Sequence, residues 1–424
     1  MVLRFYMYRL PAAAWLLAGI FLLAPPCAAE PTALGPGFEH PNALWLVVEG
    51  DGHTLTLLDA AAMVRVHQAT SAAPLRGAIE TNDDGRFAYL LAGAGTIVKY
   101  QLPQLVAVAQ TDVGAVRTFG LSADGRWLLV ALNGPDRLVL LDANLVQVRI
   151  YPVTTLDGAA TGRVSSILRN APRKSFIATL GGIHELWEIS WDPQAEPIFD
   201  GLVHDYRMGE GVASSGFLGI RRTPLDAIMP DALLSMDGTS VVGTTEPAAA
   251  RPSRTEVINL NIRRRIATLA LAPGNAAAAV HGNGREYLAT VDAAGAVVLQ
   301  DLRTGQVAQT VRLSSPVAAL QATLSPPALW LLSGASPAGP FDLDWIDLSK
   351  PQSPRTLLAG IEGPASMQAG SGERGLMLVS GSEPVNLRYL ASDAARPAGP
   401  MVVLGLRGLR SLGVQIEWPS SADR

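Results

Sequence analysis

One short pattern recurs seven times in this chain and restricts its fold more than any other feature. A polar turn, often with Asp-Gly or Asn-Gly, leads into a strongly apolar strand, and the copies are about 40 to 65 residues apart. Glycine after Asp or Asn permits the positive φ of a tight hairpin turn. The copies are DDGRFAYLLAG from Asp83, ADGRWLLVALN from Ala123, APRKSFIATLG from Ala171, MDGTSVVGTTE from Met236, GNGREYLATVD from Gly282, SPPALWLLSG from Ser325 and GSGERGLMLVSG from Gly370.

The strand after each turn is apolar on both faces, as in the run from Trp127 to Leu132. A strand of this kind has to lie between two neighbouring sheets. A further strand that ends near an acidic residue follows, for example from Leu138 to Asp142. Units of this length made only of strands predict an all-β fold, a single β-propeller domain over residues 30–424. Eight blades are the favoured count, and seven are the alternative.

The two ends of the predicted ring are expected to meet in one blade. The segment from Ala43 to Asp59 resembles an eighth unit without its inner or outer strand, and the run from Leu412 to Trp418 is suited to supply it. The repeat is interrupted once, between the fourth and fifth units, by an insertion at residues 200–226. Loops of that length in a compact fold are commonly functional.

The first 29 residues have the features of a cleaved secretory signal. Arg4 and Arg9 precede an apolar run from Ala12 to Leu23, and Cys27-Ala28-Ala29 places small residues before Glu30. We therefore expect a periplasmic protein with no membrane span after signal removal. The single cysteine of the chain would leave with the signal, so we expect neither a disulfide nor a cysteine metal ligand.

Composition and motifs exclude several function classes. The formal net charge of −4 and the lack of a basic stripe argue against a nucleic-acid binder. The sequence has no phosphate loop, no HExxH, no GxSxG and no paired-cysteine metal site. The six histidines are not paired at helical or strand spacing, and the ordinary interpretation of each is a turn or surface residue.

Arginines at corresponding places in the units are the strongest candidates for a binding site. In a propeller, the segments that enter the innermost strands converge on one face of the central channel. Arg76, Arg117 and Arg163 occupy that position in successive units, and Arg222 follows from the insertion. Guanidinium groups bind carboxylates and phosphates in a forked geometry, so this set predicts a small anionic ligand. The alternative is that these are ordinary exposed arginines at the ends of loops.

The insertion itself contains a dense polar group around His204. A loop of this kind can lie over the mouth of the channel, with His204 as a general base or an axial metal ligand. The alternative is a solvated decoration of the ring.

Three segments resemble the haem d1 propeller family. They are VGAVRTFGLSADGRWLLVAL from Val113, HELWEISWD from His184 and TPLDAIMPDALLSMDG from Thr223. The family comprises the d1 domain of cytochrome cd1 nitrite reductase and periplasmic proteins of haem d1 biosynthesis of the NirF type. The resemblance implies an anionic haem d1-type tetrapyrrole as ligand, with Arg117 in contact with one of its carboxylates.

The chain departs from the family pattern at the iron ligand and at the distal histidines. Arg76-Gly77 occupy the position of the iron-ligating histidine, Pro230-Asp231 replace one distal histidine, and Ala272 or its neighbours replace the other. There is no CxxCH, so we expect no covalent c-type haem. These departures argue against nitrite reduction.

Two functions from different classes follow from this sequence. The first is a periplasmic propeller of the haem d1 biosynthesis type, which binds an anionic tetrapyrrole at an Arg-lined face, either with a redox step or as a carrier. In it, Arg76, Arg117, Arg163 and Arg222 are ligand-binding residues, and His204, Asp231 and His281 are the candidate catalytic residues. The second is a non-catalytic scaffold for periplasmic partner proteins. A quinoprotein-like enzyme would need a tryptophan-docking repeat and calcium carboxylates, which the chain lacks.

Overall fold

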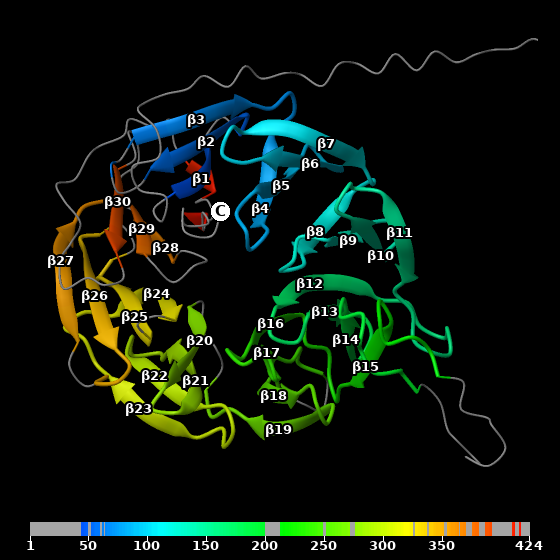
Figure 1. The fold of residues 1–424 in the computed structure, drawn as a ribbon. Helices are drawn as coiled ribbons and strands as arrows, with labels where there is room; N and C mark the ends of the chain where they lie inside the picture. The colour runs from blue at the N-terminus through cyan, green and yellow to red at the C-terminus, as the bar shows by residue number, and fades with distance from the viewer. Residues whose placement is uncertain are drawn as a thin grey trace, which may run out of the picture.

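Strands make up all of the regular secondary structure that is described, and they form eight sheets. The computed structural model describes residues 44–416 except 50–51, 60–61, 63, 200–212, 249–251, 272–275, 325–326, 337–338, 352–353, 364, 370–374, 381–385, 392–408 and 412–414. The sheets stand around a common centre like the blades of a propeller (Figure 1). The predicted all-β propeller is therefore confirmed, and the eight sheets agree with the favoured count of eight blades. In the described ranges, no helix is long and apolar enough to cross a membrane.

Each blade is an antiparallel sheet whose strands follow one another from the centre outward. The innermost strands are β4 (Leu75–Thr81), β8 (Val116–Leu121), β12 (Arg163–Asn170), β16 (Asp231–Leu234), β20 (Ala277–Gly282), β24 (Val317–Leu324) and β28 (Ala365–Ala369). The second strands are β1 (Leu44–Glu49), β5 (Phe87–Ala92), β9 (Trp127–Leu132), β13 (Ser175–Gly181), β17 (Ser240–Thr244), β21 (Arg285–Val291), β25 (Pro327–Ser333) and β29 (Gly375–Ser380).

The strands further from the centre complete the blades, which we number from 1 (β1–β3) to 8 (β28–β30). The third strands are β2 (Thr54–Asp59), β6 (Thr96–Gln101), β10 (Arg137–Asp142), β14 (Glu185–Ser190), β18 (Thr255–Asn259), β22 (Val297–Asp301), β26 (Phe341–Asp347) and β30 (Asn386–Ala391). The outer strands are β3 (Val64–Thr70), β7 (Val106–Asp112), β11 (Gln147–Pro152), β15 (Ile220–Pro224), β19 (Arg264–Thr268), β23 (Val307–Val311) and β27 (Arg355–Ile361).

The hydrophobic core lies between neighbouring blades. The second strand β13 is buried along its whole length, and β9 is buried after its first residue. Side chains from adjacent blades join in common clusters, such as the one in which Leu129 of blade 3 packs with Phe176 and Trp187 of blade 4. A single sheet cannot bury both of its faces, so each blade depends on its neighbours for burial.

The ring closes in blade 1, where the two ends of the chain meet. Strands β31 (Leu409–Ser411) and β32 (Gln415–Ile416) pair antiparallel with β1 on its inner side. Figure 1 shows these red strands beside the blue β1. The sequence left open whether the first unit lacked its inner or its outer strand. The inner strand is the one that comes from the C-terminal part of the chain.

The Asp-Gly turns also connect neighbouring blades. Gly125 has a φ of 67°, and a Cβ there would lie 2.7 Å from the Cβ of Asn82 in the preceding blade. The turn of blade 5 is held in the same way, because the side-chain amide of Asn170 donates to the carbonyl of Gly238 at 2.8 Å. Glycine at these two positions therefore serves the φ of the turn and the close approach of the next blade.

The predicted insertion at 200–226 is shorter than expected. Residues 220–224 form β15, the outer strand of blade 4, which pairs with β14 from Glu185 to Ile189. Ser214 also bridges to Ile198. The sequence missed β15 because two arginines interrupt the apolar pattern of this strand. Residues 200–212 lie outside the described residues.

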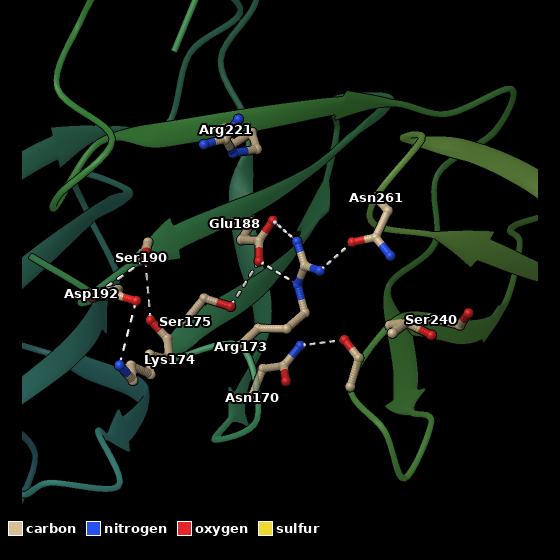
Figure 2. Close-up of polar contacts among 12 residues, drawn as sticks. Asn170, Arg173, Lys174, Ser175, Glu188, Ser190, Asp192, Arg221, Ser240 and Asn261 are labelled. Atoms are coloured by element: carbon tan, nitrogen blue, oxygen red, sulfur yellow. Dashed lines mark hydrogen bonds and ion pairs between the residues drawn. The ribbon is translucent and has the colours of Figure 1, made fainter. Parts of the chain in front are cut away.

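A buried carboxylate between blades 4 and 5 shows how polar groups hold the ring. Glu188 is 5% exposed and accepts hydrogen bonds from the Oγ of Ser175 at 2.9 Å and the Nε of Arg173 at 2.9 Å. Arg173 also donates to the side-chain oxygen of Asn261 in blade 5 (Figure 2). These hydrogen bonds thus stabilise the buried charge of Glu188 and connect blades 4 and 5.

We expect Glu188→Ala to lower the free energy of unfolding by about 3 kcal/mol, because it leaves the Arg173 guanidinium in a half-buried site without its partner. Urea unfolding measures this change. The matched control is Asp192→Ala, which removes the more exposed ion pair with Lys174 and should cost less than about 1 kcal/mol. Equal losses in the two variants would contradict the assignment.

Candidate functional site

The inner strands run in one direction and so define two faces of the ring. Their first residues lie at one end, which we call the start face, and the Asp-Gly turns follow their last residues at the other end, the turn face. Neighbouring inner strands are in contact, among them β4 with β8 and β8 with β12. Residues at the beginning of these strands are therefore brought together around the centre of the ring (Figure 1).

Three of the four predicted ligand-binding arginines lie together on the start face. Arg76 is the second residue of β4, Arg117 the second of β8 and Arg163 the first of β12. All three are exposed. Among the described residues, neither Arg76 nor Arg163 forms an ion pair. Three adjacent inner strands thus present cations to solvent on the start face.

A β-bulge sets the position of Arg117. The register between β8 and β9 shifts between Val116 and Thr118, so Arg117 has no partner in the ladder. A bulge of this kind redirects the side chain of the extra residue. The Nη2 of Arg117 lies 3.9 Å from the Oδ1 of Asp136, and both side chains are more than a third exposed. A pair this long and exposed contributes little, so Arg117 is available to a ligand.

The turn that follows β9 on the same face and the first residue of β10 contain buried polar atoms without partners. The Oδ1 of Asn133 and the Nε of Arg137 are inaccessible to solvent and form no hydrogen bond. Buried polar groups are almost always paired in folded proteins, and exceptions are frequent at functional sites. These atoms flank Asp136 in the chain and so lie near Arg117.

The predicted residue Asp231 lies on the same face as the three arginines. It is the first residue of β16, the inner strand of blade 5, and it is exposed. Its position relative to its strand matches that of Arg163 in blade 4. The start face therefore contains three cations and one carboxylate at the ends of four successive inner strands.

The structure corrects the prediction for Arg222. This residue lies on β15, the outer strand of blade 4, and not on an inner strand. Its Nη1 donates to the Oε2 of Glu185 at 2.7 Å and to the carbonyl of Thr154 at 2.9 Å, and its guanidinium stacks on the ring of Trp187. Arg222 is thus occupied with structural contacts. Because the sequence analysis missed β15, it placed Arg222 in a loop beside the channel.

The structure also corrects the grouping of His281 with the arginines. His281 is the fifth of the six residues of β20, so it lies at the turn face. Its charge acts on Glu286, its cross-strand partner on β21. His281 and the start face thus lie at opposite ends of β20. His204 falls in the range 200–212 and so lies outside the described residues.

Two other histidines lie at start-face turns. His184 is exposed in the turn between β13 and β14, and His53 lies between β1 and β2, where its Nδ1 is 3.0 Å from the carbonyl of Ser71. The sequence analysis treated both as ordinary turn residues, since no local motif distinguishes them. Within the described ranges, no group of three His, Cys, Asp or Glu residues is arranged to hold a metal ion.

An arginine connects the inner strands near the turn face. The Nη1 of Arg169, on β12, donates to the carbonyl of Thr81 at 3.2 Å and to the Oδ1 of Asp83 at 3.1 Å, both in blade 2. The contact passes the inner strand of blade 3, which lies between β4 and β12 in the ring. Blades 2 and 4 are therefore tied together at the end of the ring opposite the exposed arginines.

Glu80 is the most perturbed carboxyl in this region. It lies on β4, half-buried, and accepts a hydrogen bond from the backbone of Leu121 on β8. Burial raises the pKa of Glu80 to about 7, although the nearby charge of Arg169 and the hydrogen bond oppose the shift. The sequence analysis missed Glu80 and Arg169, because their strands are far apart in the chain.

Comparison with known proteins supports the resemblance found in the sequence. Residues 39–199 match the family described as the cytochrome D1 heme domain. This segment spans strands β1 to β14, which belong to the first four blades. This segment includes Arg76, Arg117 and Arg163. The predicted resemblance to the haem d1 propeller family is thus confirmed.

A curated relative and two solved structures extend the comparison. The chain is 37% identical over 159 residues to a dihydro-heme d1 dehydrogenase of Pseudomonas aeruginosa, which is 37% of this chain and 32% of that protein. The chain therefore matches about a third of the length of this relative. The structure of dihydro-heme d1 dehydrogenase NirN in complex with DHE matches with a TM-score of 0.68 and 22% identity, over 89% of this chain and 76% of that one.

A structure described as a eukaryotic initiation factor matches with a TM-score of 0.52 and 9% identity, over 89% of this chain and 99% of that one. At these identities both structural matches show the fold alone.

Proposed function

We propose that this propeller binds an anionic tetrapyrrole of the haem d1 type at its start face, as a protein of haem d1 biosynthesis. The observation that carries the proposal is the set of Arg76, Arg117 and Arg163 at the beginning of three adjacent inner strands. Tetrapyrroles of this class have several carboxylates on one macrocycle, and arginines at separate positions suit such a ligand. The matched family segment contains all three.

The residues of the start face fit the acidic side chains of such a ligand. Arg76, Arg117 and Arg163 would hold carboxylates. Asp231, the exposed carboxylate that begins the next inner strand, is proposed as the proton acceptor. A bound haem d1-type group would supply a redox-active iron, and the protein's part is to bind and orient it.

The cellular location and the mature form of the protein are part of the same proposal. Residues 1–29 are proposed to be a signal peptide that directs the chain to the periplasm. Residues 30–424 are proposed to form the mature propeller without a covalent c-type haem. The relative from P. aeruginosa is a dehydrogenase of dihydro-heme d1. This name favours a role on a haem d1 precursor over nitrite reduction.

Absorption spectroscopy tests the proposal directly. Purified protein is titrated with an iron tetrapyrrole that has free carboxylate side chains, and with the same macrocycle after its carboxylates are esterified. We expect a saturable shift of the absorption bands with the free acid, weaker binding at higher salt, and little or no shift with the ester. Absence of a shift with the free acid, or equal shifts with both, would contradict the proposal.

A further inference from the structure

The seam where the inner strands of blades 2, 3 and 4 meet contains more carboxyl groups than cations. Arg169 reaches Asp83 at 3.1 Å, and Asp84 forms a separate ion pair with Arg86 at 2.7 Å. The carboxylates of Asp84 and Asp124 lie close enough to Asp83 to raise its pKa, after the larger effect of burial. Glu80 completes the group from β4. The charge of Arg169 thus acts on both Asp83 and Glu80.

The surroundings of Glu80 favour its neutral form. Its cross-strand partner on β5 is Tyr89, a fully buried side chain whose pKa is raised to about 12, mainly by burial. On the side of blade 3 the carboxyl meets the backbone of Leu121, and on the side of blade 4 it meets the charge of Arg169. Among the described residues, Arg169 is the cation whose charge acts on the carboxyl of Glu80. Removing such a carboxyl from water favours protonation.

Glu80 and Arg76 lie on the same inner strand. The register of β4 against β5 shifts between them, so Arg76 lies opposite Leu91 and Glu80 lies opposite Tyr89, two residues apart on β5, which corresponds to about 7 Å along that strand. An anion bound at Arg76 therefore adds negative charge close to Glu80 on the same strand, and the half-buried side chain of Glu80 is only partly screened from it by salt.

We propose that Glu80 takes up a proton when an anionic ligand binds at Arg76, Arg117 and Arg163. This inference rests on the proposed function. A bound carboxylate disfavours the ionised form of a nearby acid, so the ligand binds more tightly when Glu80 is neutral. By linkage, protonation of Glu80 and binding of the anion strengthen each other by the same factor. Glu80 is thus a positioning residue that makes ligand affinity depend on pH near neutrality.

The first test needs no ligand. Infrared difference spectra of the protein between pH 5 and pH 9 should contain the carbonyl band of a carboxylic acid that titrates near neutral pH. The band should be absent in Glu80→Gln and should remain in Asp83→Asn. A wild-type protein without this band, or a Glu80→Gln variant that keeps it, would overturn the assignment of the titrating group.

The second test measures the coupling. The affinity for a free-acid iron tetrapyrrole is measured from pH 6 to pH 8, together with proton uptake from calorimetry in two buffers of different ionisation enthalpy. We expect the wild-type affinity to fall about 3- to 10-fold over this range and that of Glu80→Gln to change less than about 2-fold. Glu80→Asp, which retains an acid, should restore part of the dependence.

The two proposals fail in different ways. Identical pH dependence and proton uptake in the wild type and Glu80→Gln would overturn the coupling and leave the binding function intact. A protein that binds no free-acid tetrapyrrole at any pH would overturn the proposed function and the coupling together, while the infrared test would still assign the group that titrates. Melting curves of each variant establish that the ring is folded.

Discussion

Replacing Arg76, Arg117 and Arg163 together by alanine should weaken binding of a free-acid tetrapyrrole by about 100-fold or more. A hydrogen bond between charged groups contributes about 1.5 to 3 kcal/mol, and every 1.4 kcal/mol is a factor of ten in affinity. Because the arginines are exposed, we expect each single substitution to cost a free energy near the lower end of this range, which corresponds to about a 10-fold weaker affinity. The absorption titration described above measures the dissociation constants.

The control for this series is Arg222→Ala. That residue donates to Glu185 and Thr154 on the outer side of blade 4, so its loss should lower thermal stability and leave tetrapyrrole affinity within about 2-fold. The salt dependence provides a second check, because removal of three cations should flatten it. A loss of affinity in Arg222→Ala equal to that of the triple variant would show that the effect is general and not local to the start face.

Ending the chain at residue 408 should produce the largest loss of stability. This truncation removes β31 and β32, which pair with the inner side of β1. Leu44 and Trp45 on that strand are fully buried, and each buried large apolar side chain contributes about 1.5 to 3 kcal/mol. We expect the melting temperature to fall by more than about 10 °C, or the chain to fail to fold.

The control is a chain that ends at residue 416 and keeps both strands. It should melt within a few degrees of the full-length protein. Circular dichroism follows the melting, and limited proteolysis reports whether blade 1 is open. Equal melting temperatures for the two truncations would show that β31 and β32 do not contribute to closure of the ring.

The sequence predicted the strands that lie between blades better than the strands at the rim. Strands such as β9 and β13 are buried on both faces, and their apolar runs have no other simple interpretation. The outer strand β11 is exposed at five of its six residues, so its polar and apolar residues follow no core pattern. The rim strand β15 was missed for the same reason, and with it the true position of Arg222.

The candidate site was predictable only where it depends on position within the repeat. Arg76, Arg117 and Arg163 were identified because each begins a unit, and the order of the units determines their place on the ring. Glu80 and Arg169 act through contacts between strands that are far apart in the chain, and no motif joins them. His281 was grouped wrongly because it lies near the turn at the far end of its strand, a distinction that needs strand direction and length.

Closure of the ring through β32 also bears on how this protein reaches its native state. Blade 1 cannot be complete until residue 416 has been synthesised, since β1 near the beginning of the chain pairs with Gln415 and Ile416 near its end. Such contacts give a high contact order, and chains of this topology fold slowly. During synthesis, the blades that have already formed would keep unpaired strand edges until the C-terminal strands are made. Such edges make the incomplete protein prone to aggregation and dependent on chaperones.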